Sequence, residues 1–122
     1  LGVKVRQLEG LEEHDRSNVP HMRSGEFISM MEVFFRRPGE RVLGKETADD
    51  VFDRIDEAIE KVVTESSEET VAVVSHGTAL ALFLAEYGAE KNEFELWRSM
   101  GLPSYAVMTM PDYEIVELVE RI

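Results

Sequence analysis

The sequence predicts an α/β fold in which helices cover a mixed sheet. A run of β-branched residues at 71–75 leads directly into an uncharged apolar segment, as a buried strand followed by a buried helix would. An amphipathic helix is predicted before this unit, at 47–64, and two strand-like segments follow it near the end of the chain. Alternating strands and helices that end in a hairpin are typical of an α/β sandwich with a mixed sheet.

Residues 1–8 are predicted to form a short strand. Val3 and Val5 would lie on one side of it and Lys4 and Arg6 on the other, because successive side chains of a strand point to opposite faces. The polar residues that follow are expected to form an irregular loop.

A helix is predicted to begin at Ser24 and to extend to Arg36 or Arg37. Ser24 is expected to cap it, since a serine hydroxyl can accept a hydrogen bond from the first free backbone N–H groups. Phenylalanines and methionines recur along it at helical spacing. Pro38 and Gly39 are expected to end it.

The clearest helix is predicted to begin at Thr47 and to extend to about Thr64. Thr47 and Asp50 form a variant of the capping box, with aspartate in place of the usual glutamate or glutamine. Its apolar residues recur at three- and four-residue intervals and form one stripe. The stripe consists of Val51, Ile55, Ala58, Ile59 and Val62, and Asp53, Asp56 and Glu60 are expected to face solvent.

The last third of the chain is predicted to hold two helices and a hairpin. The helix at 78–87 is apolar on nearly all sides and is therefore expected to be buried, with Gly88 as its C-terminal cap. A short helix is predicted at 93–99. Strands at 104–110 and 113–119 are expected to be joined by a tight turn.

The composition excludes several classes of partner. A net charge of −12, from 25 acidic and 13 basic residues, argues against nucleic acid and anionic membranes, which need a clustered positive field. No apolar run reaches the ~20 residues of a membrane span, and no signal peptide is visible. The absence of cysteine excludes disulfide scaffolds and fits a reducing compartment, so a cytoplasmic location is expected.

His76 is the first candidate for chemistry. It stands between a predicted buried strand and a helix, at the strand end where α/β proteins build their sites. Gly77 has no side chain and would let a ligand approach the backbone closely. Thr78 could cap the helix while its backbone N–H faces an anion. An imidazole at such a place can donate a hydrogen bond to phosphoryl oxygens. The alternative is a structural histidine at the end of a strand.

The acidic cluster at 12–15 is the second candidate. One carboxyl group in a partly desolvated cleft could act as a general acid toward a leaving alkoxide, although charge runs are more often solvated loops. Arg16 and Arg23 follow in the same polar stretch and could meet an anionic substrate. The three histidines show no metal-ligand spacing, so neither a metal nor a cofactor is expected.

Four segments, in this order, resemble the histidine phosphatase superfamily with its phosphoglycerate mutase-like fold. They are LEGLEEHDRSN, FFRRPGERVLGKETADDVFDRI, VAVVSHGTALALFL and FELWRSMGLPSYAVM. The resemblance runs from about residue 3 to residue 119. It implies that His76 is the second histidine of a phosphate pocket lined by the backbone at Gly77 and Thr78. It also implies that Glu13, two positions after Leu11, is the proton donor.

Two departures from the family pattern stand out. Arg16 and Ser17 replace an aromatic residue and a glycine, which alters the loop on the substrate side. More importantly, the family begins with a strand that ends in Arg-His-Gly, whose histidine is phosphorylated during turnover, and no such triplet occurs here. Without that nucleophile the covalent route is closed, so this chain alone is expected to be inactive.

The resemblance implies an incomplete fold and a partial enzyme. Residues 1–122 would be the C-terminal part of a single three-layer sandwich that lacks its first two strands. The bare edges of the strand at 71–75 would then be covered by a missing N-terminal segment or by a second copy of the chain. The complete enzyme would hydrolyse or transfer phosphoryl groups of small phosphomonoesters through a phosphohistidine, a phosphatase being favoured over a mutase. The alternative is a non-catalytic phosphate-binding or assembly module of the same fold.

Overall fold

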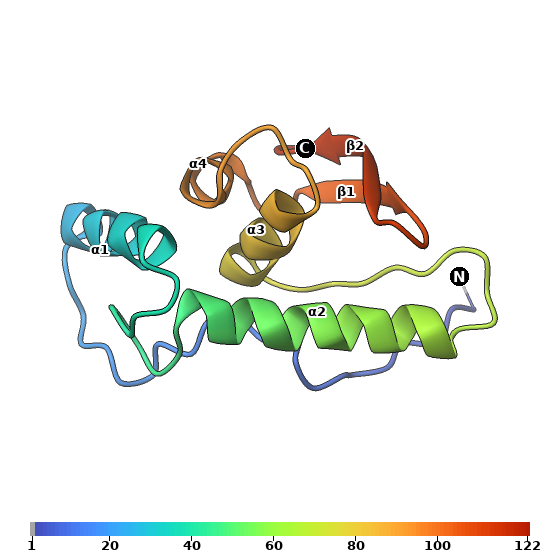
Figure 1. The fold of residues 1–122 in the computed structure, drawn as a ribbon, viewed down its shortest axis with the longest axis horizontal. Helices are drawn as coiled ribbons and strands as arrows, with labels where there is room; N and C mark the ends of the chain where they lie inside the picture. Colours follow the sequence, from blue (N-terminus) through green and yellow to red (C-terminus); the bar gives the residue numbers. More distant parts are fainter. Residues whose placement is uncertain (1) are drawn as a thin grey trace.

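A computed structural model describes residues 2–122, and these residues form helices followed by a hairpin (Figure 1). The elements are α1 (Ser24–Arg36), α2 (Ala48–Glu65), α3 (Gly77–Glu86), α4 (Glu93–Ser99), β1 (Tyr105–Thr109) and β2 (Glu114–Val119). The predicted α/β class is confirmed. In the described part of the chain the sheet consists of β1 and β2, paired antiparallel.

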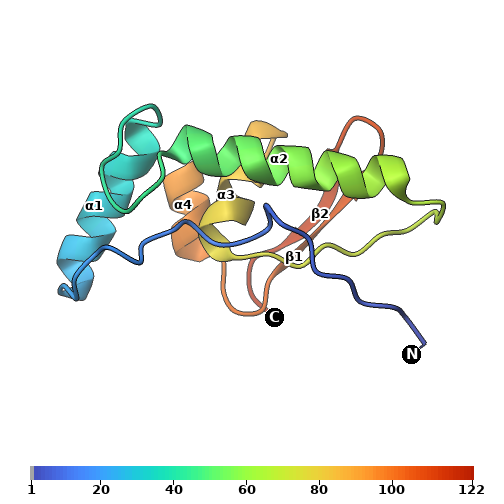
Figure 2. The same cartoon turned by 90° about the horizontal axis from the view of Figure 1, so that it is seen from below.

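Helix α3 is the centre of the packing. It contacts α2 on one side and α4 on the other, and the hairpin closes over α3 and α4 (Figures 1 and 2). The main core joins α1, α2 and α3, and a smaller one joins α3, α4 and the hairpin. Fully buried members of the main core include Met31, Phe34, Val51, Ile55 and Ala79, and the smaller core contains Ala81, Leu84 and Leu96.

The capping box that begins α2 is confirmed. The Asp50 N–H donates to Thr47 Oγ1 and the Thr47 N–H donates to Asp50 Oδ2, both at 3.0 Å. These bonds lower the pKa of the Asp50 carboxyl. One detail of the predicted solvent face is wrong: the Tyr87 hydroxyl donates to Asp56 Oδ1 at 2.5 Å, so Asp56 links α2 to the end of α3.

Helix α1 has the predicted range but not the predicted cap. Arg23 takes the capping position, with extended backbone angles and no side-chain cap bond, and Ser24 is already the first helical residue. A hydroxyl can cap only from the extended residue that precedes the helix. The helix is anchored instead by its buried residues, which are Met31, Phe34 and Phe35.

Helix α3 has Tyr87 as its C-terminal capping residue, and Gly88, which was predicted to be the cap, is the next residue. Gly88 follows the last turn with φ +100°, a conformation that glycine adopts without strain. The Ala89 N–H donates to the Leu84 carbonyl at 3.1 Å, and the Gly88 N–H donates to that of Ala85 at 3.4 Å. These two bonds satisfy carbonyls that the helix end leaves free. The short helix and the hairpin predicted beyond Gly88 are also confirmed.

The strands predicted at 1–8 and 71–75 are wrong. In the described residues neither segment belongs to a sheet, and 71–75 runs as a plain connection from α2 to α3 (Figures 1 and 2). Leu1 lies outside the described residues. Val74 is 85% exposed, and Val3 and Val5 are also exposed. A β-branched sequence favours extended backbone, but a strand forms only where a neighbour supplies ladder hydrogen bonds.

Across residues 2–122, no helix combines the length and the apolar character needed to cross a bilayer. The apolar helix α3 has ten residues, and it is covered by α2, α4 and the hairpin.

Candidate functional site

His76 stands at the point where the connection from α2 turns into α3. It is the capping residue of α3, with extended backbone angles, and its side chain is exposed. Its predicted position immediately before a helix is confirmed. His76 lines an open cavity of about 510 Å³ together with Val74 and with residues 6–9, 11 and 12 of the N-terminal loop. The imidazole is therefore accessible to a small solute.

Glu13 reaches the same helix start from the N-terminal loop. Its Oε2 accepts the Thr78 N–H at 2.9 Å, and its Oε1 accepts the Ala79 N–H at 3.1 Å. The first backbone N–H groups of a helix have no partner within the helix and carry the positive end of its dipole, so a carboxylate is favourable there. The structure thus brings Glu13 and the residues directly after His76 together.

Arg16 is the positively charged residue that contacts the start of α3. Its Nη1 lies 3.3 Å from Thr78 Oγ1 and 3.3 Å from His14 Nδ1, and its guanidinium lies 5.1 Å from the centre of the Phe27 ring. Its side chain is partly buried, so this charge is held near the start of α3 rather than free in solvent.

Arg23 lies elsewhere. It is an exposed residue at the start of α1. Within residues 2–122 no hydrogen bond or ion pair joins its side chain to Glu13, His76 or Thr78. Of the two arginines that sequence reasoning assigned to the anion, the structure brings one to the helix start.

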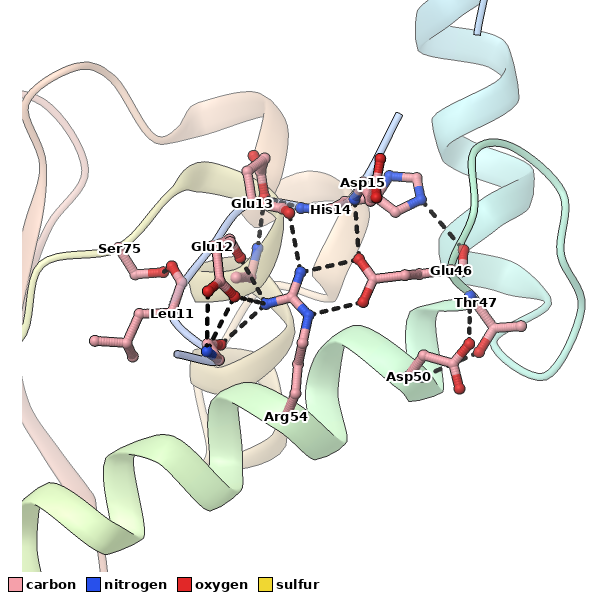
Figure 3. A network of polar contacts seen from close by, with 12 residues as sticks. Leu11, Glu12, Glu13, His14, Asp15, Glu46, Thr47, Asp50, Arg54 and Ser75 are labelled. Carbon is pink, nitrogen blue, oxygen red and sulfur yellow. Dashed lines mark hydrogen bonds and ion pairs between the residues drawn. The ribbon is translucent and has the colours of Figure 1, made fainter. Parts of the chain in front are cut away.

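Arg54 of α2 holds the loop that carries Glu13, and sequence reasoning missed it. Its guanidinium donates to three backbone carbonyls: Nη1 to Gly10 at 2.9 Å and Glu12 at 2.7 Å, and Nη2 to Glu13 at 2.9 Å (Figure 3). Because one planar guanidinium binds three carbonyls of the loop, it fixes the path of the loop backbone. A signal was present, because position 54 belongs to the helical face of Val51 and Ala58 yet carries a charge.

Glu46 completes this network, and sequence reasoning missed it as well. Its carboxylate pairs with Arg54 through both oxygens, and Oε1 also accepts the Asp15 N–H at 2.9 Å (Figure 3). The hydrogen bond from Arg54 lowers the pKa of the Glu46 carboxyl and raises that of the guanidinium. The ion pair is therefore held in its charged form, and it anchors both ends of the segment 10–15.

The glycine at position 44 lets the two loops meet. Gly44 has φ +80°, and a Cβ built there would lie 2.5 Å from the Asp15 carbonyl and 2.9 Å from His14 Nε2. A side chain would force these loops apart. The contact between the 10–15 and 40–46 loops thus depends on a residue without a Cβ.

Ser75 ties the connection before α3 to the Glu13 loop. Its hydroxyl donates to the Leu11 carbonyl at 2.6 Å (Figure 3). This bond lies one residue before His76 and two before Glu13. It aligns the two segments that carry the candidate acid and the candidate imidazole.

Comparison with known protein families shows the superfamily to which this chain belongs. A family model of the histidine phosphatase superfamily (branch 1) matches residues 1–117. The chain belongs to the histidine phosphatase superfamily. No curated protein and no solved structure matches it. The three histidines of this superfamily member are His14, His21 and His76, and none of them stands in an Arg-His-Gly triplet.

Groups that can donate hydrogen bonds to an oxyanion lie at and near the start of α3. They are the exposed imidazole of His76, the partly buried guanidinium of Arg16 and the first backbone amides of the helix. The carboxyl group of Glu13 lies against the same amides. An oxyanion would therefore have to displace Glu13 in order to use these two amides.

Proposed function

We propose that this chain is the phosphate-binding and acid-bearing part of a histidine phosphatase that acts on small phosphomonoesters. The observation that carries the proposal is the pair of hydrogen bonds from Thr78 and Ala79 to Glu13, directly after His76. They bring a carboxyl group and an accessible imidazole to the same helix start. Membership of the superfamily supplies the reaction class.

Each group has a definite task in the proposed reaction. His76 and Arg16 donate hydrogen bonds to the phosphoryl oxygens, and the backbone at Gly77 and Thr78 lines the site, with phosphate exchanging for Glu13 at the Thr78 amide. Glu13 gives a proton to the leaving alkoxide as the P–O bond breaks. The electron pair that forms the new P–N bond comes from a histidine in an Arg-His-Gly triplet. Since this chain has no such triplet, the chain alone is proposed to be inactive.

The proposed complete domain is a three-layer sandwich with a mixed sheet. In it, segment 71–75 pairs as a central strand, and residues 1–122 form the C-terminal part. The exposure of Val74 supports this proposal. Val74 lies in a β-branched run of the kind that normally forms a buried strand, yet it is 85% exposed. A preceding segment of the same protein or a second copy of the chain would cover it.

A non-catalytic module that binds phosphate or assembles with other chains is the second candidate. The exposed His76 and the partly buried Arg16 are compatible with it, because both can bind an anion without a nucleophile. The two candidates differ in what the reading frame upstream of residue 1 encodes. If that frame encodes Arg-His-Gly after a strand-like segment, the result supports the first candidate, the enzyme. If it does not, the result supports the second candidate, the non-catalytic module.

In either case we propose a cytoplasmic protein whose partners do not include nucleic acid or membranes, in keeping with its charge of −12.

Phosphate binding by the 122-residue chain tests the site. Isothermal titration with inorganic phosphate is expected to show weak binding that His76→Ala and Arg16→Ala each reduce several-fold. Arg37→Ala is the matched control, since Arg37 is exposed and pairs with Glu40 rather than with the residues at the start of α3. Equal binding by all four proteins would overturn the proposed site.

Two further measurements test activity and assembly. Hydrolysis of p-nitrophenyl phosphate by the lone chain is expected to be absent, and turnover that His76→Ala leaves unchanged would contradict the assignment. Light scattering after size-exclusion chromatography reports whether the chain covers its exposed valines by association. A stable monomer would exclude the second copy as the cover.

A further inference from the structure

His14 is a buried titratable group that the proposed reaction does not use. Its side chain is 3% exposed, between Glu13 and Asp15 in the loop that Arg54 holds. The ring packs against Phe34 of α1, with 4.4 Å between the ring centres. Both ring nitrogens nevertheless have polar partners: Nδ1 lies 3.3 Å from Arg16 Nη1 and Nε2 lies 3.2 Å from the Glu46 carbonyl.

The partners of the ring define where its proton is. A guanidinium has donors and no acceptor, so Nδ1 must accept from Arg16. A carbonyl is only an acceptor, so Nε2 must carry the proton and donate to Glu46. His14 is therefore neutral in this arrangement, with its proton on Nε2.

We propose that neutral His14 is a positioning residue that holds Arg16 at the start of α3, and that protonation of His14 releases Arg16 and weakens anion binding. The same Nη1 of Arg16 that donates to His14 lies 3.3 Å from Thr78 Oγ1. His14 and Thr78 thus contact the same nitrogen of the guanidinium. The binding half of the proposal rests on the proposed function, because it takes Arg16 as an anion ligand.

Burial of the ring and the charge of Arg16 oppose protonation of His14. A proton on Nδ1 would remove the acceptor of Arg16 and place a second cation 3.3 Å from it. Burial, followed by the charge of Arg16, lowers the pKa of His14 from its ordinary value of 6.5. The Glu46 carbonyl and carboxylate act in the opposite direction, but that carboxylate is already paired with Arg54.

Two further neighbours favour a charged ring but do not reverse the direction of the pKa shift. The Leu43 carbonyl raises the pKa of His14, and the Asp15 carboxylate on the same loop attracts a charged ring. Helix α1 contributes uncharged side chains, Phe34 at the ring and Met31 at Arg16, and α3 contributes Thr78. No other element of the described chain supplies a carboxylate that would stabilise a charged His14.

Two substitutions separate positioning from packing. His14→Phe keeps an aromatic ring against Phe34 but removes the acceptor for Arg16. His14→Asn keeps an oxygen acceptor near the place of Nδ1 and cannot be protonated in this range. If His14 serves packing alone, the phenylalanine variant should bind anions as wild type does. If it positions Arg16, the asparagine variant should rescue the binding that the phenylalanine variant loses.

Sulfate is the probe for binding, because it is tetrahedral and keeps its double negative charge from neutral to mildly acidic pH. At neutral pH we expect His14→Phe to weaken sulfate binding about five-fold, the equivalent of one hydrogen bond, and His14→Asn to change it little. On acidification, the ratio of wild-type to His14→Asn affinity should fall. His76 is present in all three proteins, so its contribution cancels in these comparisons. Equal sulfate affinity of wild type and His14→Phe would overturn the proposal.

Nuclear magnetic resonance tests the positioning without any ligand. Long-range proton–nitrogen spectra of the 122-residue chain should show His14 with its proton on Nε2 at neutral pH. The Arg16 side-chain resonances should then shift with the titration of His14, and His14→Asn should abolish that shift. A ring protonated on Nδ1 at neutral pH, or Arg16 resonances that ignore the titration, would overturn the positioning. Absence of sulfate binding by wild type, with the expected spectra, would instead overturn the proposed function and the binding half of this proposal.

Discussion

The Arg54 guanidinium and the Glu46 carboxylate form a two-point ion pair, with 2.7 Å from Nε to Oε2 and 2.9 Å from Nη2 to Oε1. The pair lies under the loop that delivers Glu13 to α3 (Figure 3). It joins α2 to the loop before it, since Glu46 immediately precedes the capping residue Thr47. The position of the candidate acid therefore depends on a side chain of α2, which holds the backbone of the Glu13 loop.

Substitution of Arg54 should unfold the Glu13 loop. Arg54→Ala leaves three backbone carbonyls and a partly buried carboxylate without their donor, and we expect a loss of about 2–4 kcal/mol in the free energy of unfolding. Urea denaturation measures it. Arg37→Ala is the matched control, because Arg37 pairs with Glu40 on an exposed surface and should change stability by less than about 0.5 kcal/mol. Similar losses in the two variants would show that the carbonyl contacts contribute nothing.

Gly44→Ala should destabilise the contact between the two loops. The residue has positive φ, and its new Cβ would lie 2.5 Å from the Asp15 carbonyl, so a loss of more than about 2 kcal/mol is expected. Thermal denaturation reports it. Gly25→Ala in α1 meets no atom within 4 Å and should instead stabilise the chain by up to about 1 kcal/mol. Equal effects at both glycines would refute the close approach at position 44.

Loss of the Thr47 hydroxyl should shorten or weaken α2. Thr47→Ala removes the acceptor of the Asp50 N–H, and such caps are worth about 1 kcal/mol. Chemical denaturation followed by circular dichroism gives the value. Thr64→Ala, at an exposed position near the other end of α2, should stay within about 0.5 kcal/mol of wild type. A smaller effect at Thr47 than at Thr64 would argue against the capping box.

Stability should fall on mild acidification because of His14. Its pKa is lowered in the folded state from the ordinary value of 6.5, so below pH 6.5 the unfolded chain binds more protons than the folded one. The contribution of His14 is complete above that pH and is lost as the pH falls toward the folded-state pKa. Urea midpoints across this range should decline in wild type and stay flatter in His14→Asn. Parallel curves for the two proteins would contradict the sign of the shift.

Local signals account for the elements that sequence reasoning placed correctly. The capping box at Thr47, the stripe from Val51 onward and the glycine at position 88 each act within a few residues, and α2 and α3 form as they indicate. Segment 71–75 shows the limit. Its β-branched residues fix a preference for extended backbone, but the strand itself needs a partner that no local pattern supplies.

The residues of the candidate site also differ in how well the sequence predicted them. His76 was singled out by its place before a predicted helix, and Glu13 was chosen within the acidic cluster by the family resemblance. The structure brings the loop of Glu13 to the start of the helix that follows His76. Arg54 and Glu46 were missed because arginine bonds to backbone carbonyls leave no pattern in the side chains of the loop they hold. Arg23 was assigned to the anion from nearness in sequence, yet α1 carries it away on an exposed turn.

The carboxylate of Glu13 on the amides of Thr78 and Ala79 has a consequence for turnover. It is a tethered competitor, and a short tether gives such a group an effective concentration of about millimolar or more. Any free oxyanion that reaches these amides must displace it, whereas the side chain returns without diffusing. In the proposed reaction of the complete enzyme, inorganic phosphate would therefore leave these amides quickly, and inhibition by accumulated product would be weak.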